Sequence, residues 1–192
     1  MKSHKILVQM ILCAIFAAIL CICSPLAIPV GPIPITLSVF AVLLCGVVLE
    51  LKLSLISVAV YLLLGLFLPV FSRGMTGLAA FPGPTGGYIW SYPLMIVTLW
   101  LVQGAMLRLA GPRPARVVEY LSAFLGCAAA LPVCYLCGTA QFTLVAHTTV
   151  RHALSVCVLP FLVPDLIKAA AAALLGVTLR EILRKSILPS ES

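Results

Sequence analysis

An acid and a base lie close together inside a long apolar run in the last third of the chain. Asp165 and Lys168 are three residues apart in the segment FLVPDLIKAAAAALL. On a helix such positions share a face, with Cβ atoms roughly 5–6 Å apart. Charged residues in such apolar surroundings usually face a cavity or each other. The pair is therefore either an internal ion pair that fixes helix packing or a polar binding site. One small group carrying both N–H and C=O could satisfy both side chains.

The glycine-rich segment GPTGGY, residues 83–88, is the second candidate. Its residues Thr85, Gly86, Gly87 and Tyr88 open a long apolar run. Glycine allows a tight turn and close approach of a ligand, and free N–H groups at a helix start attract anions. The segment lacks the lysine and hydroxyl of a nucleotide-binding P-loop, so we do not expect the chain to hydrolyse ATP. A plain turn before a helix explains the same residues, and Tyr88 also suits an aromatic belt at a membrane interface.

Arg73 is the only basic residue between positions 53 and 107. Its guanidinium could hold a ligand carboxylate, or it could be a solvated charge of an outer loop. The cysteines all fall inside apolar runs, where they are typically small packing residues. Cys134 and Cys137 form a C-x-x-C pair, but no second pair or nearby histidine completes a zinc site. We therefore expect no catalytic residues, no metal and no cofactor.

Composition indicates the class of protein that holds these residues in place. Of 192 residues, 63% are apolar and 9% are charged, whereas soluble domains carry roughly 25% charged residues. So few charges cannot coat a water-facing surface, and so apolar a chain cannot stay solvated, which excludes a soluble enzyme and a disordered protein. A membrane span needs about 20 residues, so the chain has room for about six spans and little else. We expect a single all-α, polytopic domain over residues 1–192 in the lipid bilayer.

The apolar runs place six spans, and charge sets their orientation. Basic residues gather at alternate ends of the runs, which is typical of cytoplasmic loops and not of nucleic-acid binding. Six spans then put both termini in the cytoplasm. The proline-rich residues 24–34 predict a stiff loop or a re-entrant segment, and our hypothesis is that it covers the site from outside. Residues 143–159 predict an outer loop with helical character. The spans are residues 6–23, 35–49, 53–70, about 86–107, about 117–142, and a last helix from about Pro164 to residue 179.

Small residues mark one face of the first span. Ala14 and Ala18 are four residues apart, with Ala17 between them. This small-xxx-small spacing lets a second helix approach closely. The face either packs inside the protein or docks on another membrane subunit.

Four segments of the chain stand out: PIPITL at 32–37, YLLLGLFLPV at 61–70, GPTGGY at 83–88 and LPFLVPDLIKAAAAALL at 159–175. Taken together, in this order and spacing, they resemble the BioY family, the biotin-binding S components of energy-coupling factor (ECF) transporters. The chain departs from the family's pattern at Pro164, where glycine is more common, and at Ser91-Tyr92, where a Gly-Phe pair is common.

The resemblance implies a six-helix S component, without catalytic activity, in the plasma membrane of a bacterium or an archaeon. It also implies capture of biotin from outside, docking on a transmembrane T subunit with two ATPase subunits, and inward release when the S component topples. In this family the Asp and Lys of the last helix contact biotin, which carries over to Asp165 and Lys168. The Ala-xxx-Ala face of the first helix, here Ala14 and Ala18, resembles the surface that docks on the T subunit.

Biotin also suits the residues themselves. Its ureido ring supplies N–H for Asp165 and C=O for Lys168, and its thioether ring and aliphatic chain suit an apolar pocket with few polar anchors. We expect the biotin carboxylate to be bound by Arg73 or by backbone N–H groups near Gly86 and Gly87. Two other functions stay open: an S component for another vitamin, such as thiamine or riboflavin, and an ion-coupled secondary transporter that uses Asp165 as a proton site.

Overall fold

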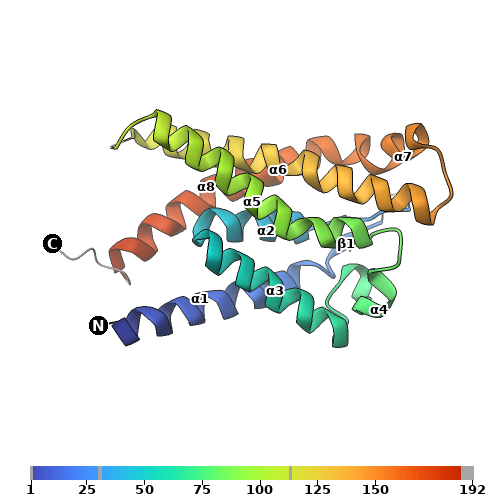
Figure 1. Cartoon of the computed structure of the whole chain (residues 1–192), viewed down its shortest axis with the longest axis horizontal. Coiled ribbons are helices and arrows are strands. Elements are labelled where there is room, and N and C mark those ends of the chain that lie inside the picture. The colour runs from blue at the N-terminus through green and yellow to red at the C-terminus, as the bar shows by residue number, and fades with distance from the viewer. Residues whose placement is uncertain (1, 30–31, 113, 187–192) are drawn as a thin grey trace.

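The computed structural model describes residues 2–29, 32–112 and 114–186, and helices dominate it. The helices α1, α2, α3, α5, α6 and α8 lie roughly along one long axis and alternate in direction (Figure 1). The all-α class is therefore confirmed. The elements are α1 (Lys2–Cys23), β1 (Ala27–Ile28), β2 (Ile35–Thr36), α2 (Ser38–Val48), α3 (Leu51–Phe67), the 3-10 turn η1 (Ser72–Gly74), α4 (Gly77–Ala80), α5 (Gly86–Leu109), α6 (Arg116–Val145), α7 (Val150–Cys157) and α8 (Leu159–Ser186).

Helix α2 is the centre of the bundle. All of its residues except Phe40 are buried, and it packs against α1, α3, α5 and α8. A helix that is apolar on every side needs neighbours on every side, because no face of it suits water. The first residue of α2, Ser38, is buried at one end of the bundle, where the polar pair of α8 also lies.

Within residues 2–29, 32–112 and 114–186, four helices are long and apolar enough to cross a membrane: α1 from Ile6 onward, α5, α6 and α8. The apolar helices α2 and α3 have 11 and 17 residues. Both are shorter than the roughly 20 residues of a full span. Six full-length spans are therefore not confirmed, because two of the six predicted runs form shorter helices.

Two helix starts differ from the sequence-based expectation. Helix α8 begins at Leu159 and continues through Pro164. Pro160 lies in the first turn, where no N–H has an intrahelical partner, and Pro164 removes only the bond to the Pro160 carbonyl. Helix α2 begins at Ser38, three residues late, because β2 pairs antiparallel with β1. The expected helical part of the segment 143–159 is α7, whose first turn is capped by the Thr149 side chain.

The two ends of the bundle differ in composition. The β1–β2 hairpin, α4 and α7 lie together at one end, which we call the hairpin end (Figure 1). The opposite end, which we call the basic end, holds the start of α1, the α5–α6 connection and the end of α8. Arg108, Arg116, Arg184 and Lys185 lie there, in the terminal turns of their helices.

Candidate ligand-binding site

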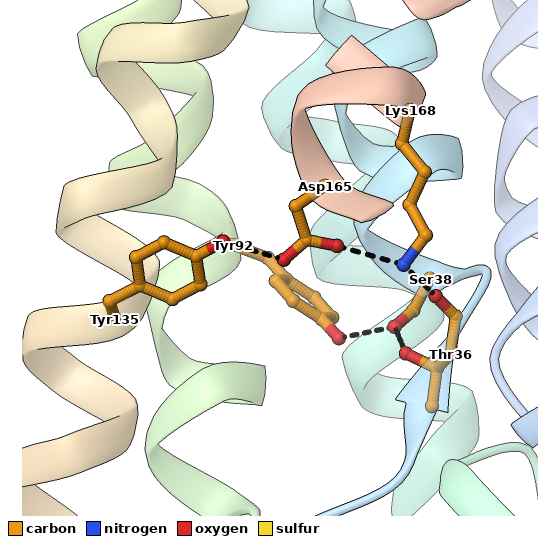
Figure 2. A network of polar contacts seen from close by, with 6 residues as sticks. All are labelled: Thr36, Ser38, Tyr92, Tyr135, Asp165 and Lys168. Carbon is orange, nitrogen blue, oxygen red and sulfur yellow. Dashed lines mark hydrogen bonds and ion pairs between the residues drawn. The ribbon is translucent and has the colours of Figure 1, made fainter. Parts of the chain in front are cut away.

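A buried ion pair lies near the start of α8 (Figure 2). The Lys168 Nζ donates to Asp165 Oδ1 at 2.8 Å, and Asp165 is only 3% exposed. The Tyr135 hydroxyl donates to the other carboxylate oxygen at 2.9 Å, and Lys168 Nζ also donates to the Thr36 carbonyl at 2.8 Å. Each charge thus has partners inside the protein, as a buried ion pair requires. Because an ammonium group has three N–H bonds and two are used here, one is left for a ligand.

Hydroxyl groups extend this network onto α2 and α5. The Tyr92 hydroxyl donates to Ser38 Oγ at 2.8 Å, and Ser38 Oγ lies 2.5 Å from Thr36 Oγ1, with either atom as the donor. Figure 2 shows these side chains converging from separate elements. They come from β2, α2, α5, α6 and α8. The network therefore joins the hairpin to the helices at the ion pair.

A cavity lies beside the network, bordered by Asp165 and Lys168. The space between its lining residues, including the part that is open to solvent, measures about 570 Å³. Small-molecule sites typically combine an apolar wall with a few polar groups. This cavity has that character. Its apolar wall includes Ile33, Val39, Ile89 and Phe161, and four tyrosines also line it: Tyr61, Tyr88, Tyr92 and Tyr135.

Two hydroxyl groups of the cavity wall have no hydrogen-bond partner. Ser72 Oγ and Thr85 Oγ1 are buried, and within the described part of the chain neither makes a hydrogen bond. A buried polar group without a partner costs about 1–3 kcal/mol, and native proteins keep few of them. Both hydroxyls are therefore positioned to receive a polar group of a ligand.

The other tyrosines of the wall use their hydroxyls inside the protein. Tyr61 donates to Ser24 Oγ at 2.8 Å, and Tyr88 donates to the Cys157 carbonyl at 3.1 Å. The Tyr92 ring stacks on that of Tyr61, with ring centroids 6.3 Å apart and an angle of 30° between the ring planes. Because their hydroxyls have partners, these tyrosines offer a ligand mainly their apolar rings.

The sequence profile of the BioY family matches residues 1–185 of the chain. The chain belongs to the BioY family. A relative from Pyrococcus horikoshii named "Probable biotin transporter BioY" is 36% identical over 166 residues, which cover 86% of this chain and 91% of that protein. A relative from Thermotoga maritima named "Biotin transporter BioY" is 34% identical over 175 residues, covering 91% and 96% of the two chains.

A crystal structure described as "the S-component for biotin from an ECF-type ABC transporter" has the same fold as this BioY chain. The TM-score is 0.83, with 23% identity over 94% of this chain and 95% of that one. At this identity the likeness establishes the S-component fold. The family and the fold together confirm the resemblance drawn from the four sequence segments.

Four residues singled out in the BioY sequence border the cavity: Thr85, Tyr88, Asp165 and Lys168. Arg73 does not. It is exposed and lies at the turn η1 with φ 58°, a left-handed conformation that is uncommon outside glycine. Its chain neighbour Ser72 borders the cavity, so Arg73 lies next to the wall without forming part of it.

Gly86 and Gly87 are buried where α5 passes close to its neighbours, and neither borders the cavity. A Cβ atom at Gly87 would lie 2.2 Å from the Cys137 carbonyl oxygen of α6, and one at Gly86 would lie 2.1 Å from the Phe81 carbonyl oxygen. The Gly86 N–H is already donated to the Gly83 carbonyl at 3.1 Å. The glycines let backbone segments touch, and this close packing sets the position of the neighbouring wall residues.

Ala14 and Ala18 lie on the outward face of α1, and both are exposed. Large apolar neighbours on this face are exposed as well, with Ile11 at 49% and Ile15 at 48%. Ala17, between the two alanines, is buried against the bundle. Within the described chain, the face of α1 that carries Ala14 and Ala18 is therefore exposed.

Sequence reasoning missed several residues of the site. Tyr135, Ser38 and Ser72 are single hydroxyl-bearing residues in apolar surroundings, and nothing in their local sequence distinguishes them. Thr36 contributes its backbone carbonyl, which any residue carries. The one signal that could have indicated such partners is general: a buried ion pair needs further hydrogen bonds to satisfy its remaining donors and acceptors.

Proposed function

We propose that this BioY protein is the biotin-binding S component of an ECF transporter, a membrane subunit that captures biotin outside the cell and is not itself an enzyme. The buried Asp165–Lys168 pair beside a mostly apolar cavity carries the proposal. The pair presents a hydrogen-bond acceptor and a donor side by side. Two relatives are named as a biotin transporter or a probable one. The ureido ring of biotin has an N–H donor for Asp165 and a C=O acceptor for Lys168.

In the proposed complex, a ureido N–H donates to Asp165 while Lys168 donates its remaining N–H to the ureido C=O. A carboxylate has about four lone-pair sites, and Lys168 and Tyr135 occupy two of them. Biotin therefore adds to the ion pair without breaking it. Hydrogen bonds to charged groups contribute about 1.5–3 kcal/mol each, so these two contacts are expected to supply much of the specificity.

We assign the biotin carboxylate to the Ser72 and Thr85 hydroxyls, with Arg73 beside them. Both hydroxyls are buried in the cavity wall and are free to donate. Arg73, adjacent to Ser72, is exposed and attracts the anionic ligand at long range, a role that charged rim groups commonly have. The Gly86 N–H is already hydrogen-bonded, so the hydroxyls are the better donors.

A calorimetric titration of the purified protein with biotin tests the function. We expect one site of high affinity, and no competition from thiamine or riboflavin at a hundredfold excess. Binding of another vitamin in place of biotin would show that the protein is an S component for that vitamin. Uptake driven by a proton gradient without any ATPase partner would instead identify a secondary transporter.

Each of the variants Ser72→Ala and Thr85→Val is expected to keep or gain stability and to lose affinity for biotin. Removing a buried hydroxyl without a partner should leave the ligand-free protein as stable as before, or more stable by up to about 1–3 kcal/mol. Biotin affinity should fall roughly tenfold because a carboxylate contact is lost. Thr139→Val is the matched control, since Thr139 Oγ1 is also buried without a partner but does not border the cavity. Equal biotin affinity in all three variants would refute the carboxylate assignment.

We propose that six helices cross the plasma membrane with both termini in the cytoplasm. The alternating directions of α1, α2, α3, α5, α6 and α8 support this topology, since α2 and α3 are apolar and are flanked by the longer helices (Figure 1). The arginines and lysines at the basic end suit the cytoplasmic side. A reporter enzyme fused to either terminus and found active outside the cell would contradict this topology.

The exposed Ala14 and Ala18 suit docking on the ECF T subunit, which would carry the ATPase subunits. Small residues allow close helix approach, and nothing within the described chain covers this face of α1. Ala14→Phe should abolish co-purification with an ECF module while biotin affinity stays unchanged. Ala105→Phe, at an exposed alanine of α5, should leave both unchanged. Co-purification of the Ala14→Phe variant at wild-type yield would rule out this docking face.

A further inference from the structure

A second and larger cavity lies at the basic end, away from the biotin site. It is bounded by the end of α5, the α5–α6 connection, the start of α6 and the last turns of α8, and its open space measures about 1680 Å³. We call it the basic cleft. Among the residues that the structure describes, its charged lining comprises four basic and two acidic residues: Arg116, Arg180, Arg184, Lys185, Glu119 and Glu181. These described residues carry an excess of two positive charges.

The acid Glu181 neutralises only part of this charge. Its Oε1 accepts from Arg116 at 3.0 Å and from Lys185 at 2.7 Å. Over the described residues, Arg180 and Arg184 have no carboxylate within 4.0 Å. These two arginines are four residues apart on α8, where like charges destabilise each other. A bound anion would remove this repulsion.

Arg180 is held in place by the core of the bundle. Its guanidinium donates to the Val47 carbonyl near the end of α2, and its side chain is half-buried. A guanidinium has five N–H donors, and one hydrogen bond leaves most of them free to point into the cleft. The planar guanidinium group matches phosphate oxygens in pairs. The basic cleft thus has a fixed donor group and a second arginine one turn away.

The cleft also has an apolar side. Leu107 and Val177 belong to its lining. Leu109 and Val117, at the helix ends on either side of the α5–α6 connection, are 86% and 75% exposed. Large apolar side chains so exposed beside arginines suit the boundary between lipid head groups and acyl chains. A soluble anion would make no use of them.

We propose that the basic cleft binds the phosphate of an anionic phospholipid of the cytoplasmic leaflet, with Arg180 and Arg184 contacting the phosphodiester and the acyl chains lying along the exposed apolar side chains. Basic pockets between membrane helices on the cytoplasmic side bind such head groups in other proteins. The site is separate from the cavity at the hairpin end, and its test does not depend on biotin.

Native mass spectrometry of delipidated protein in detergent, titrated with phosphatidylglycerol or phosphatidylcholine, tests this proposal. One phosphatidylglycerol should be retained at concentrations at which phosphatidylcholine is not. Arg184→Gln should weaken retention about fivefold, the factor expected for one basic residue near an anionic lipid. Arg108→Gln is the matched control, because Arg108 is exposed at the same end but does not line the cleft. Arg180→Gln should have a larger effect, and thermal unfolding reports whether that variant stays folded.

Each outcome of this titration is informative. Equal retention of the two lipids, or equal weakening by Arg184→Gln and Arg108→Gln, would overturn the proposal. Inorganic phosphate at millimolar concentration is then added as a competitor of the bound phosphatidylglycerol. If it displaces phosphatidylglycerol completely, the cleft is a site for a soluble phosphate and the lipid assignment is wrong. If the lipid stays bound, the acyl chains contribute as proposed.

Discussion

Replacing Lys168 by methionine is expected to lower the affinity for biotin roughly 10- to 150-fold. The methionine stem has a length similar to that of lysine but lacks the donor to the ureido carbonyl, a charged hydrogen bond with a contribution of about 1.5–3 kcal/mol. The substitution also leaves Asp165 buried, with Tyr135 as its remaining hydrogen-bond donor among the described residues. Breaking a buried ion pair on one side costs about 3–5 kcal/mol, so the free energy of unfolding should fall as well. Calorimetric titration and thermal unfolding in detergent measure the two effects.

A double variant separates the loss of binding from the loss of stability. Asp165→Asn combined with Lys168→Met removes both charges, and replacing a whole buried ion pair is often close to neutral for stability. The double variant should therefore unfold at a higher temperature than Lys168→Met alone, yet still bind biotin weakly. Lys52→Met, at an exposed lysine of α3, controls for the loss of one positive charge. If Lys168→Met and Lys52→Met bind biotin with equal affinity, the assignment of Asp165 and Lys168 to the binding site is wrong.

The central ion pair was predictable because charge is scarce in this chain. An isolated charge in an apolar run is so unfavourable that Asp165 and Lys168, one helical turn apart, had to be partners or face a cavity. Their direct contact at 2.8 Å follows from local helix geometry alone. The remaining partners, Tyr135 and Thr36, lie 30 and 132 residues away from the atoms they contact. Their placement depends on how α6 and the hairpin pack on α8, and no local pattern encodes that.

Local rules also misplaced the start of the last helix. Proline at a first helical turn predicted a start near Pro164, whereas α8 begins at Leu159. The rule rests on the N–H that proline lacks. Near the start of a helix, this lack removes a single backbone hydrogen bond, so the helix can continue through the proline. Because the helix begins earlier, Phe161 lies in its first turn and adds to the cavity wall. Local sequence also could not predict the packing of Gly86 and Gly87, since their neighbours on α6 lie about fifty residues further along the chain.

Gly87→Ala is expected to destabilise the protein by about 1–3 kcal/mol or more. The new Cβ would lie 2.2 Å from the Cys137 carbonyl oxygen, and this oxygen belongs to the backbone of α6, so the start of α5 must move away from α6. Thr85 and Tyr88 flank the glycine in sequence and border the cavity, so the same movement should weaken biotin binding. Thermal unfolding without biotin, followed by a biotin titration, measures both consequences.

Gly104→Ala provides a matched control within the same helix, because nothing lies within 4 Å of the Cβ position at Gly104. Alanine is favoured over glycine inside a helix by roughly 0.5–1 kcal/mol, so this variant should be slightly more stable and should bind biotin normally. The comparison distinguishes two roles for the glycines of GPTGGY. A packing role requires that Gly87→Ala lowers the unfolding temperature of the ligand-free protein. A role in direct ligand contact requires the ligand-free protein to unfold as Gly104→Ala does, with only the biotin-dependent increase in unfolding temperature reduced. The 2.2 Å approach to a backbone atom predicts the first result.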